Sequence, residues 1–296
     1  MKVLRHWPIA VGALLPLVAV VELAGNAWTA SLVPPPAGFE PARRIVAEGH
    51  RDGDLVLVYP DWLGEGRVAL GQWLSIRDEG RGDILDYPRV WELTLEGRQS
   101  PEVAGLPVEQ SWSFDGLKLT LYRNTTFDPP LWRAYDEIAR ARAAVRMADG
   151  DKPCRLDPRT QRHECGAQFG EPWVWVGPIL LTDMQQQPRV CLWSHPTDRG
   201  PIVITFDGVP TGRRLTVHTA LSYVGGRDMD KKPVRMDVEV DGQTVGTTMQ
   251  PDGAPWRSWE FAVPFGPGRR TLQFRISSEF QGMRHYCWDA AVRGVP

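Results

Sequence analysis

The segment VRMDVEV at residues 234–240 alternates apolar and charged side chains at every position. This period-two alternation is typical of a β-strand that has one face in a core and the other in water. The segment LQFRI at residues 272–276 repeats the pattern, with Leu272, Phe274 and Ile276 set against Gln273 and Arg275. We therefore expect both segments to be strands of a half-buried sheet.

Other short runs with similar texture lie between residue 171 and the end of the chain, parted by Gly, Pro and Asp. They are Glu171–Leu181, Arg189–Ser194, Ile202–Phe206, Arg214–Leu221, Thr244–Met249, Trp256–Val263 and His285–Val292. About nine short strands separated by turn signals predict a β-sandwich, and a jelly roll is the topology that we expect.

The sequence before residue 125 has a different texture. The unbroken apolar run LVLVY at residues 55–59 follows the turn signal Asp52-Gly53 and predicts a strand buried on both faces, central to a parallel or mixed sheet covered by helices. The other expected elements are helices over Ala42–His50 and Arg67–Ile76, a strand over Tyr87–Leu95, and a hairpin of Val108–Phe114 and Leu117–Tyr122 joined at Asp115-Gly116. This order predicts a small α/β layer domain.

The expected fold class is α+β, in three parts. Residues 1–30 form a signal peptide or membrane anchor, residues 31–125 a small α/β domain that begins with a Pro34-Pro35-Pro36 linker, and residues 126–296 a helix plus the β-sandwich. The helix is expected over Pro129–Met147, because Leu131, Trp132, Tyr135, Ile138 and Val145 make an apolar stripe at helical spacing.

The N-terminal residues have the layout of an export signal. Lys2 and Arg5 precede an apolar stretch, and small residues up to Ala27 follow it. Cleavage after Ala27 would release a periplasmic protein, whereas retention would anchor the chain in the inner membrane by residues 7–27. We favour the anchor, although two prolines and Glu22 are unfavourable in a span. In both cases the bulk of the chain is exported.

The chain has four cysteines, Cys154, Cys165, Cys191 and Cys287. An even number in an exported chain favours two disulfides. We expect Cys154–Cys165 because the two are close in sequence, and Cys191–Cys287 because the opening and closing strands of a jelly roll tend to be neighbours. Buried reduced thiols are the alternative, and the spacings match no compact zinc-ligand pair.

Charge and motifs exclude several functions. The net charge is −2 and no Lys/Arg block stands out, so a nucleic-acid partner is not expected. The chain contains no Walker loop, no dinucleotide-binding Gly-x-Gly-x-x-Gly, no Gly-x-Ser-x-Gly elbow and no His-Glu-x-x-His helix. We therefore expect no cofactor, no metal and no catalytic site.

Two sets of residues are candidates for binding. Asp61 and Trp62 follow the LVLVY strand, at the edge where α/β sheets place ligands, and Asp61 with Glu65 could act as an acid–base pair. The alternative is that Trp62 is core and the charges are solvated.

Trp256, Arg257 and Trp259 form the second set and could offer an aromatic platform to a sugar ring, or pack into the sandwich. A Cys191–Cys287 bridge in antiparallel strands would also place His285 opposite Trp193 and near His195. Hydrogen bonding at one end of the sandwich is the expected role of these histidines, in preference to a metal site.

The pieces Gly53–Trp62, Tyr87–Trp91 and Phe114–Leu119 resemble the extracytoplasmic region of bacterial glycosyltransferases related to protein O-mannosyltransferases, which use polyprenyl-phosphate sugars. The resemblance covers about residues 40–122. It implies no catalytic residue here, because the catalytic carboxylate of that family lies on a loop of a many-helix membrane domain. The C-terminal part looks like galactose-binding-type jelly rolls, which usually bind glycans or proteins without chemistry.

These features together predict an exported, membrane-anchored, non-catalytic protein that binds an envelope glycan or an integral membrane-protein complex. Two alternatives stay open. One is an envelope polysaccharide hydrolase or transferase that uses Asp61 and Glu65, and the other is a structural accessory subunit of a membrane complex.

Overall fold

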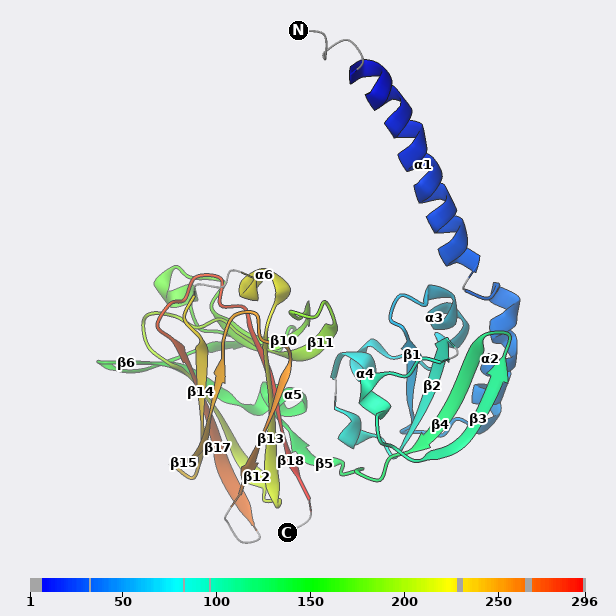
Figure 1. The fold of residues 1–296 in the computed structure, drawn as a ribbon. Coiled ribbons are helices and arrows are strands. Elements are labelled where there is room, and N and C mark those ends of the chain that lie inside the picture. Colours follow the sequence, from blue (N-terminus) through cyan, green and yellow to red (C-terminus); the bar gives the residue numbers. More distant parts are fainter. Residues whose placement is uncertain are drawn as a thin grey trace. The chain divides into compact units, whose positions relative to one another are not determined.

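The computed structural model describes residues 7–31, 33–81, 83–95, 97–227, 231–263 and 268–294 (Figure 1). The chain divides into two compact units. The first contains the residues up to Leu74 together with Tyr87–Thr125, and the second contains Ser75–Asp86 together with the residues from Thr126 onward. The short segment Ser75–Asp86 therefore interrupts the first unit in sequence but belongs to the second in space.

The N-terminal helix α1 spans Trp7–Ser31, while Lys2 and Arg5 of the expected export signal lie outside the described residues. Within the residues that the structure describes, no helix has the length and apolarity needed to cross a membrane. The anchor expected over residues 7–27 stays a prediction. Pro16 and Glu22 lie inside α1.

The first unit is a mixed sheet whose strands follow the order β1-β2-β4-β3. The strands are β1 (Leu55–Tyr59), β2 (Arg89–Leu95), β3 (Val108–Phe114) and β4 (Leu117–Arg123), and the helices are η2 (Pro36–Phe39), α2 (Glu40–Gly49), α3 (Gly64–Leu70) and η4 (Pro101–Val103). β1 is parallel to β2, and the other pairs are antiparallel. The predicted hairpin at Asp115-Gly116 is confirmed.

Two expectations for this unit were wrong. β1 is an edge strand rather than the central one, and β2 is the strand that is buried along almost its whole length. The helix expected over Arg67–Ile76 ends at Leu70, because the chain turns at Gly71 and the apolar residues Trp73 and Leu74 reach the core from that turn. Ala42 and Val46 of α2 and Leu70 of α3 share one core with buried residues of the sheet.

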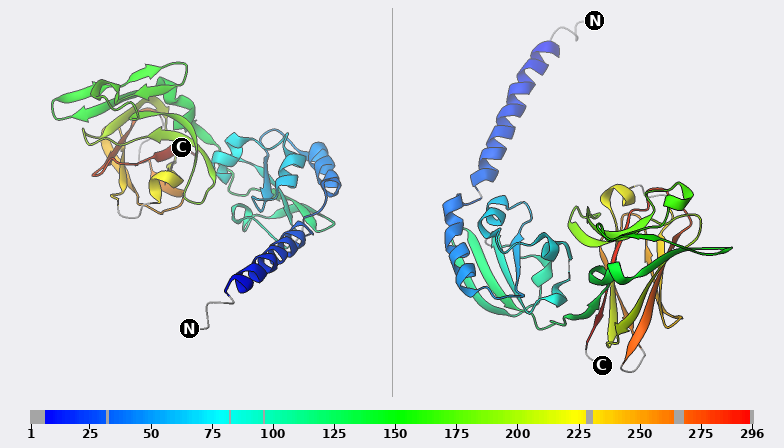
Figure 2. Two further views of the ribbon diagram at one scale, coloured as in Figure 1. Left: turned by 90° about the horizontal axis from the view of Figure 1, so that it is seen from above. Right: turned by 180° about the vertical axis from the view of Figure 1, so that it is seen from behind.

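The second unit is a β-sandwich of two antiparallel sheets, seen from further directions in Figure 2. The larger sheet has the order β16-β13-β18-β11-β10-β9-β8, with β5 paired to β18, and the smaller has the order β15-β14-β17-β12-β6-β7. The inward-facing side chains of both sheets form one hydrophobic core. The α+β class and the sandwich are confirmed, and β11 and β18 are neighbours, as expected for a jelly roll.

The elements of this unit complete the fold. They are α4 (Ile76–Arg81), η3 (Ile84–Asp86), β5 (Pro130–Arg133), α5 (Ala134–Glu137), η5 (Ile138–Arg140), β6 (Arg142–Met147), β7 (Gly150–Pro153), β8 (Arg155–Asp157), β9 (Arg162–Glu164), η6 (Ala167–Phe169), β10 (Trp175–Thr182), β11 (Pro188–Ser194), β12 (Ile202–Pro210), β13 (Arg214–Leu221), α6 (Tyr223–Gly226), β14 (Val234–Val240), β15 (Gln243–Gln250), β16 (Arg257–Ala262), β17 (Arg269–Ser278) and β18 (Tyr286–Arg293). β13 and β14 have the predicted bounds.

The helix predicted over Pro129–Met147 is wrong. The structure has strand β5, the single turn α5 and strand β6 in its place. Ala141, Ala143 and Val145 are buried and alternate with more exposed residues, so the segment also carries the period of a strand. The residues of β6 therefore fit both the helical and the strand spacing. The pairing of β6 with β12 and β7 selects the strand.

Both predicted disulfides are confirmed. Cys154–Cys165 has a Cα–Cα distance of 4.3 Å and Cys191–Cys287 one of 5.7 Å, both below the ~7 Å limit for a bridge. The second bridge joins β11 to β18 and closes a loop of 96 residues. Two disulfides indicate an oxidising, extracytoplasmic compartment.

Candidate functional site

The outer face of the larger sheet is covered by further residues of the same unit. Along β18, Tyr286, Trp288 and Val292 point into the core, so Asp289 and Arg293 point to the opposite face. All are buried, and the segment Ser75–Asp86 covers Arg293, which pairs with Asp83 and Asp86. In the same segment, the chain at Gly80 approaches Val190 of β11 so closely that a Cβ would lie 2.7 Å from its Cγ2.

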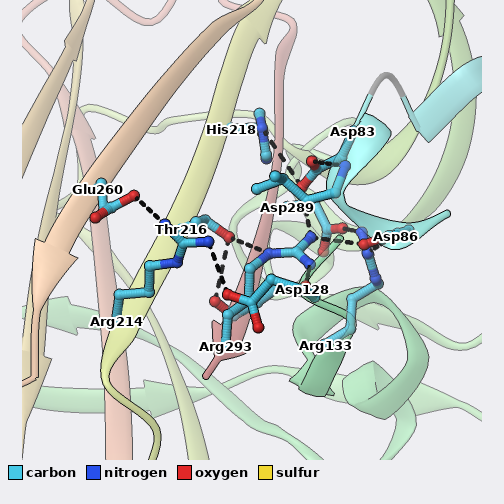
Figure 3. A network of polar contacts seen from close by, with 12 residues as sticks. Asp83, Asp86, Asp128, Arg133, Arg214, Thr216, His218, Glu260, Asp289 and Arg293 are labelled. Atoms are coloured by element: carbon cyan, nitrogen blue, oxygen red, sulfur yellow. Dashed lines mark hydrogen bonds and ion pairs between the residues drawn. The ribbon is translucent and has the colours of Figure 1, made fainter. Parts of the chain in front are cut away.

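Ion pairs hold that segment in place (Figure 3). Arg293 Nη2 donates to Asp83 Oδ2 at 2.5 Å and to Asp86 Oδ1 at 2.7 Å. Arg133 donates to Asp289 Oδ2 at 2.7 Å and also pairs with Asp86. These buried charges pair with one another, so we assign this cluster, the acidic clamp of Asp83, Asp86, Asp289, Arg133 and Arg293, a structural role.

A pocket of about 860 Å³ lies beside this covered face, within the range of ~300–1,000 Å³ typical of small-molecule sites. It is bounded by the tip of the β10–β11 hairpin, by α6 and by the residue that precedes β18. The lining residues are Leu181, Thr182, Gln186, Trp193, Ser222, Tyr223, Val224 and His285.

Trp193 forms a rigid wall of the pocket. Its ring stacks on Trp175, with ring centroids 5.4 Å apart, and lies 4.9 Å from the ring of His285. The guanidinium of Arg162 lies 4.0 Å from the centroid of Trp175 and so extends the row of planar groups. Only 9% of Trp193 is exposed, and its indole N–H has no hydrogen-bond partner among the described residues.

His285 is the central polar group of the pocket. Its Nδ1 lies 3.1 Å from Ser222 Oγ, and Ser222 Oγ also accepts the backbone N–H of Gly225 at 3.0 Å as the N-cap of α6. Burial, together with the nearby His195, Lys231 and Arg284, lowers the pKa of His285 to about 4. The ring is therefore neutral at neutral pH.

The pair Ser222 and His285 suits binding better than nucleophilic catalysis. A serine nucleophile needs a base that is oriented by a third group and basic enough to hold a proton. In the described part of the chain no carboxylate hydrogen-bonds to His285, and the lowered pKa makes this imidazole a weak base. Ser222 Oγ is moreover engaged with α6.

The predicted neighbourhood of Trp193, His195 and His285 is present, but with a different register. Trp193 pairs with Cys287 across β11 and β18, two residues away from the predicted partner His285. The rings of His195 and His285 lie 5.8 Å apart, and His195 Nδ1 lies 3.0 Å from the carbonyl oxygen of Pro196. Among the described residues, no group of three or more His, Cys, Asp or Glu could hold a metal ion.

Sequence reasoning missed the other half of the pocket. Ser222 and Tyr223 lie just after the predicted strand Arg214–Leu221, followed by Gly225 and Gly226. A serine N-cap followed by a short turn was the signal that could have identified α6. The hairpin tip with Gln186 offered no comparable signal.

Trp256, Arg257 and Trp259 lie outside this pocket and have partners within the protein. The ring of Trp256 stacks on His218 with centroids 5.5 Å apart, and the guanidinium of Arg189 lies 5.3 Å from its centroid. Trp259 packs against the core, donates its indole N–H to Thr219 Oγ1 at 3.1 Å and lies under the guanidinium of Arg257.

Asp61 and Trp62 lie in the first unit. Trp62 is 58% exposed, with the guanidinium of Arg98 5.7 Å from its ring centroid, and so is not core. Glu65, but not Asp61, lines a separate cleft of about 530 Å³ between η2, α2 and α3. The two carboxylates of the proposed acid–base pair therefore do not share this cleft.

Comparisons with known proteins found no matching family model and no matching curated relative. The resemblance to O-mannosyltransferase-related enzymes over about residues 40–122 is thus not supported. The C-terminal part resembles carbohydrate-binding β-sandwich modules among solved structures.

Three of these structures show how remote the similarity to this chain is. One is the CBM51 module of a Clostridium perfringens GH95 protein with methyl-galactose, at TM-score 0.28 and 10% identity, covering 40% of this chain and 79% of that one. The CBM6 module of LamC from Zobellia galactanivorans scores 0.26 at 10% identity, covering 40% and 87%. CBM51-2 with the INT domains of C. perfringens ZmpB scores 0.30 at 10% identity, and this chain spans 26% of that structure.

Proposed function

We propose that this chain is an exported glycan-binding protein that holds a sugar residue in the pocket beside α6. The observation that supports this most is the pocket itself, in which a rigid indole wall faces neutral hydrogen-bonding groups. The C–H face of a sugar packs on an aromatic ring, while its hydroxyls need partners that both donate and accept.

The lining residues meet both needs. Trp193 is fixed by its stack on Trp175, so the small part of its ring that is exposed is already held in place before a sugar binds. Ser222, Thr182, Gln186 and the neutral imidazole of His285 supply donors and acceptors.

Trp256, Arg257 and Trp259 form the alternative binding surface. Their intramolecular partners support placing the sugar at the pocket instead.

The two disulfides indicate an oxidising compartment outside the cytoplasm. Glycans of the cell envelope lie in that compartment, which supports such a glycan as the ligand. We include a membrane-retained form in this proposal, since the sequence of residues 7–27 has the layout of either a cleaved or a retained signal.

A glycan array probed with the full chain tests the proposal. Binding should be lost in His285→Ala and weakened at least tenfold in Tyr223→Ala, whereas Val68→Ala, an exposed residue of the first unit, serves as the matched control. Loss of binding in Trp256→Ala and Trp259→Ala, with the pocket variants unaffected, would move the site to those tryptophans. Failure of the wild-type chain to bind any glycan would refute the proposal.

A further inference from the structure

We infer that the pocket beside α6 binds a sugar that carries an aliphatic chain, as in a glycolipid or an acylated glycan. This inference rests on the glycan-binding function proposed above. The lining of the pocket combines two kinds of side chain. Its aliphatic and aromatic members are Leu181, Trp193, Tyr223 and Val224. Its hydrogen-bonding members are Thr182, Gln186, Ser222 and His285.

The short turn α6 presents both kinds of group to the pocket. Ser222 caps this turn and lies 3.1 Å from the imidazole of His285, so these two polar groups are neighbours. Tyr223 and Val224 follow directly in the turn, and both also line the pocket. Their side chains are 38% and 45% exposed, so water covers much of their apolar surface in the free protein.

Exposed apolar residues continue past the pocket. Met283 is 41% exposed, and its carbonyl oxygen lies 2.6 Å from the place that a Cβ on Gly225 of α6 would occupy. The backbone that leads to His285 therefore packs closely on α6. This packing brings a third exposed apolar residue to the turn that carries Tyr223 and Val224.

A hydroxylated ring alone does not account for this surface. Leu181 and Val224 offer neither a flat face nor a hydrogen-bond partner, which are the groups that orient a sugar. An aliphatic chain needs only apolar area, because its binding free energy grows with the apolar area removed from water. We therefore assign the sugar to Ser222 and His285, and the chain to the apolar side chains of α6.

The open form of the pocket sets the size of the expected gain. Full burial of one methylene group tightens binding by about fourfold. A chain that lies along the exposed side chains of α6 keeps one side in water, so we expect about twofold for each methylene group in contact.

Val224 offers a direct test of the contact with the chain. Val224→Thr replaces a methyl group by a hydroxyl with little change of shape, and the position is exposed, so the core is not disturbed. Val68→Thr is the matched control, because it makes the same exchange at an exposed residue of α3 in the first unit.

Isothermal titration of the full chain at pH 7 makes the measurement, with all probes below the concentrations at which they form micelles. The probes are methyl and hexyl glucosides and galactosides, the methyl 6-O-hexanoyl esters of the same sugars, and 1-hexanol. The hexyl glycosides represent glycolipids and the esters represent acylated glycans, so the tighter series identifies the source of the chain.

We expect the tighter chain-bearing series to bind at least about eightfold more tightly than the methyl glycosides. This ratio should fall at least about twofold in Val224→Thr and stay unchanged in Val68→Thr.

The outcomes separate the two proposals. Equal affinities for the methyl glycosides and both chain-bearing series would overturn the inference and leave glycan binding in place. A ratio that is the same in Val224→Thr and Val68→Thr would also overturn it, because the chain would then lie elsewhere. Binding of 1-hexanol as tight as that of the hexyl glycosides would instead refute the proposed function, since the sugar would contribute nothing, and so would the absence of binding to every probe.

Discussion

Replacing Arg293 by Met should destabilise the β-sandwich unit strongly. Arg293 is fully buried and donates to Asp83, Asp86 and Thr216. Without it, Asp86 keeps Arg133, while the hydrogen bonds and ion pairs that Asp83 keeps among the described residues are the backbone N–H of Leu85 and His218 at 3.9 Å. Removing one partner of a buried ion pair costs about 3–5 kcal/mol. For a domain of about 150–250 residues this lowers Tm by roughly 6–20 °C.

Differential scanning calorimetry of the full chain is the assay, and Arg142→Met is the control. Arg142 pairs with Asp207 on the surface, where both side chains are more than half exposed, so its loss should cost less than about 1 kcal/mol. Adding Asp83→Asn to Arg293→Met should recover part of the loss, because it removes the unpaired charge. Equal Tm values for Arg293→Met and Arg142→Met would refute the reasoning.

Three further outcomes are expected. Replacing Cys191 and Cys287 together by Ala should destabilise the second unit by up to about 4–5 kcal/mol, since the bridge closes a loop of 96 residues, and urea unfolding that is unchanged would contradict this. Burial raises the pKa of Glu92 above 4.5, so the folded state favours its protonated form and loses stability as pH rises above that value. Glu92→Gln should therefore unfold at higher urea concentration than wild type at pH 7 but not at pH 4. Sugar binding should be constant from pH 7 to pH 5 and fall near pH 4, where His285 gains a proton, and calorimetric titration across that range checks it.

The sandwich could be predicted from the sequence because its strands alternate. Val234–Val240 and Arg214–Leu221 have one polar or small face and one apolar face, and their bounds matched the structure. Arg142–Met147 was missed because its alanines fit both a helix and a strand, and only the pairing with β12 resolves the choice. Local pattern therefore predicts an element where one period dominates, and fails where tertiary pairing decides.

The candidate site could be predicted only in part. Trp193 and His285 could be placed together because a disulfide was expected between their strands. The covering of that face could not, since it depends on partners such as Asp83 and Arg293, which are 210 residues apart in sequence. Gln186 reaches the pocket only because the β10–β11 hairpin folds toward α6, and this is not encoded in local periodicity.

The acidic clamp also sets an order of events during synthesis. Asp83 and Asp86 leave the ribosome more than 200 residues before Arg293, the last residue of β18. Their carboxylates stay hydrated until β18 has been made, and this strand also brings Cys287 to Cys191. The N-terminal unit of a nascent chain usually folds first. Here the sandwich, with its covering segment, reaches its final state only after β18 has been synthesised, so a chain that stops before β18 should expose that segment to the proteases of the envelope.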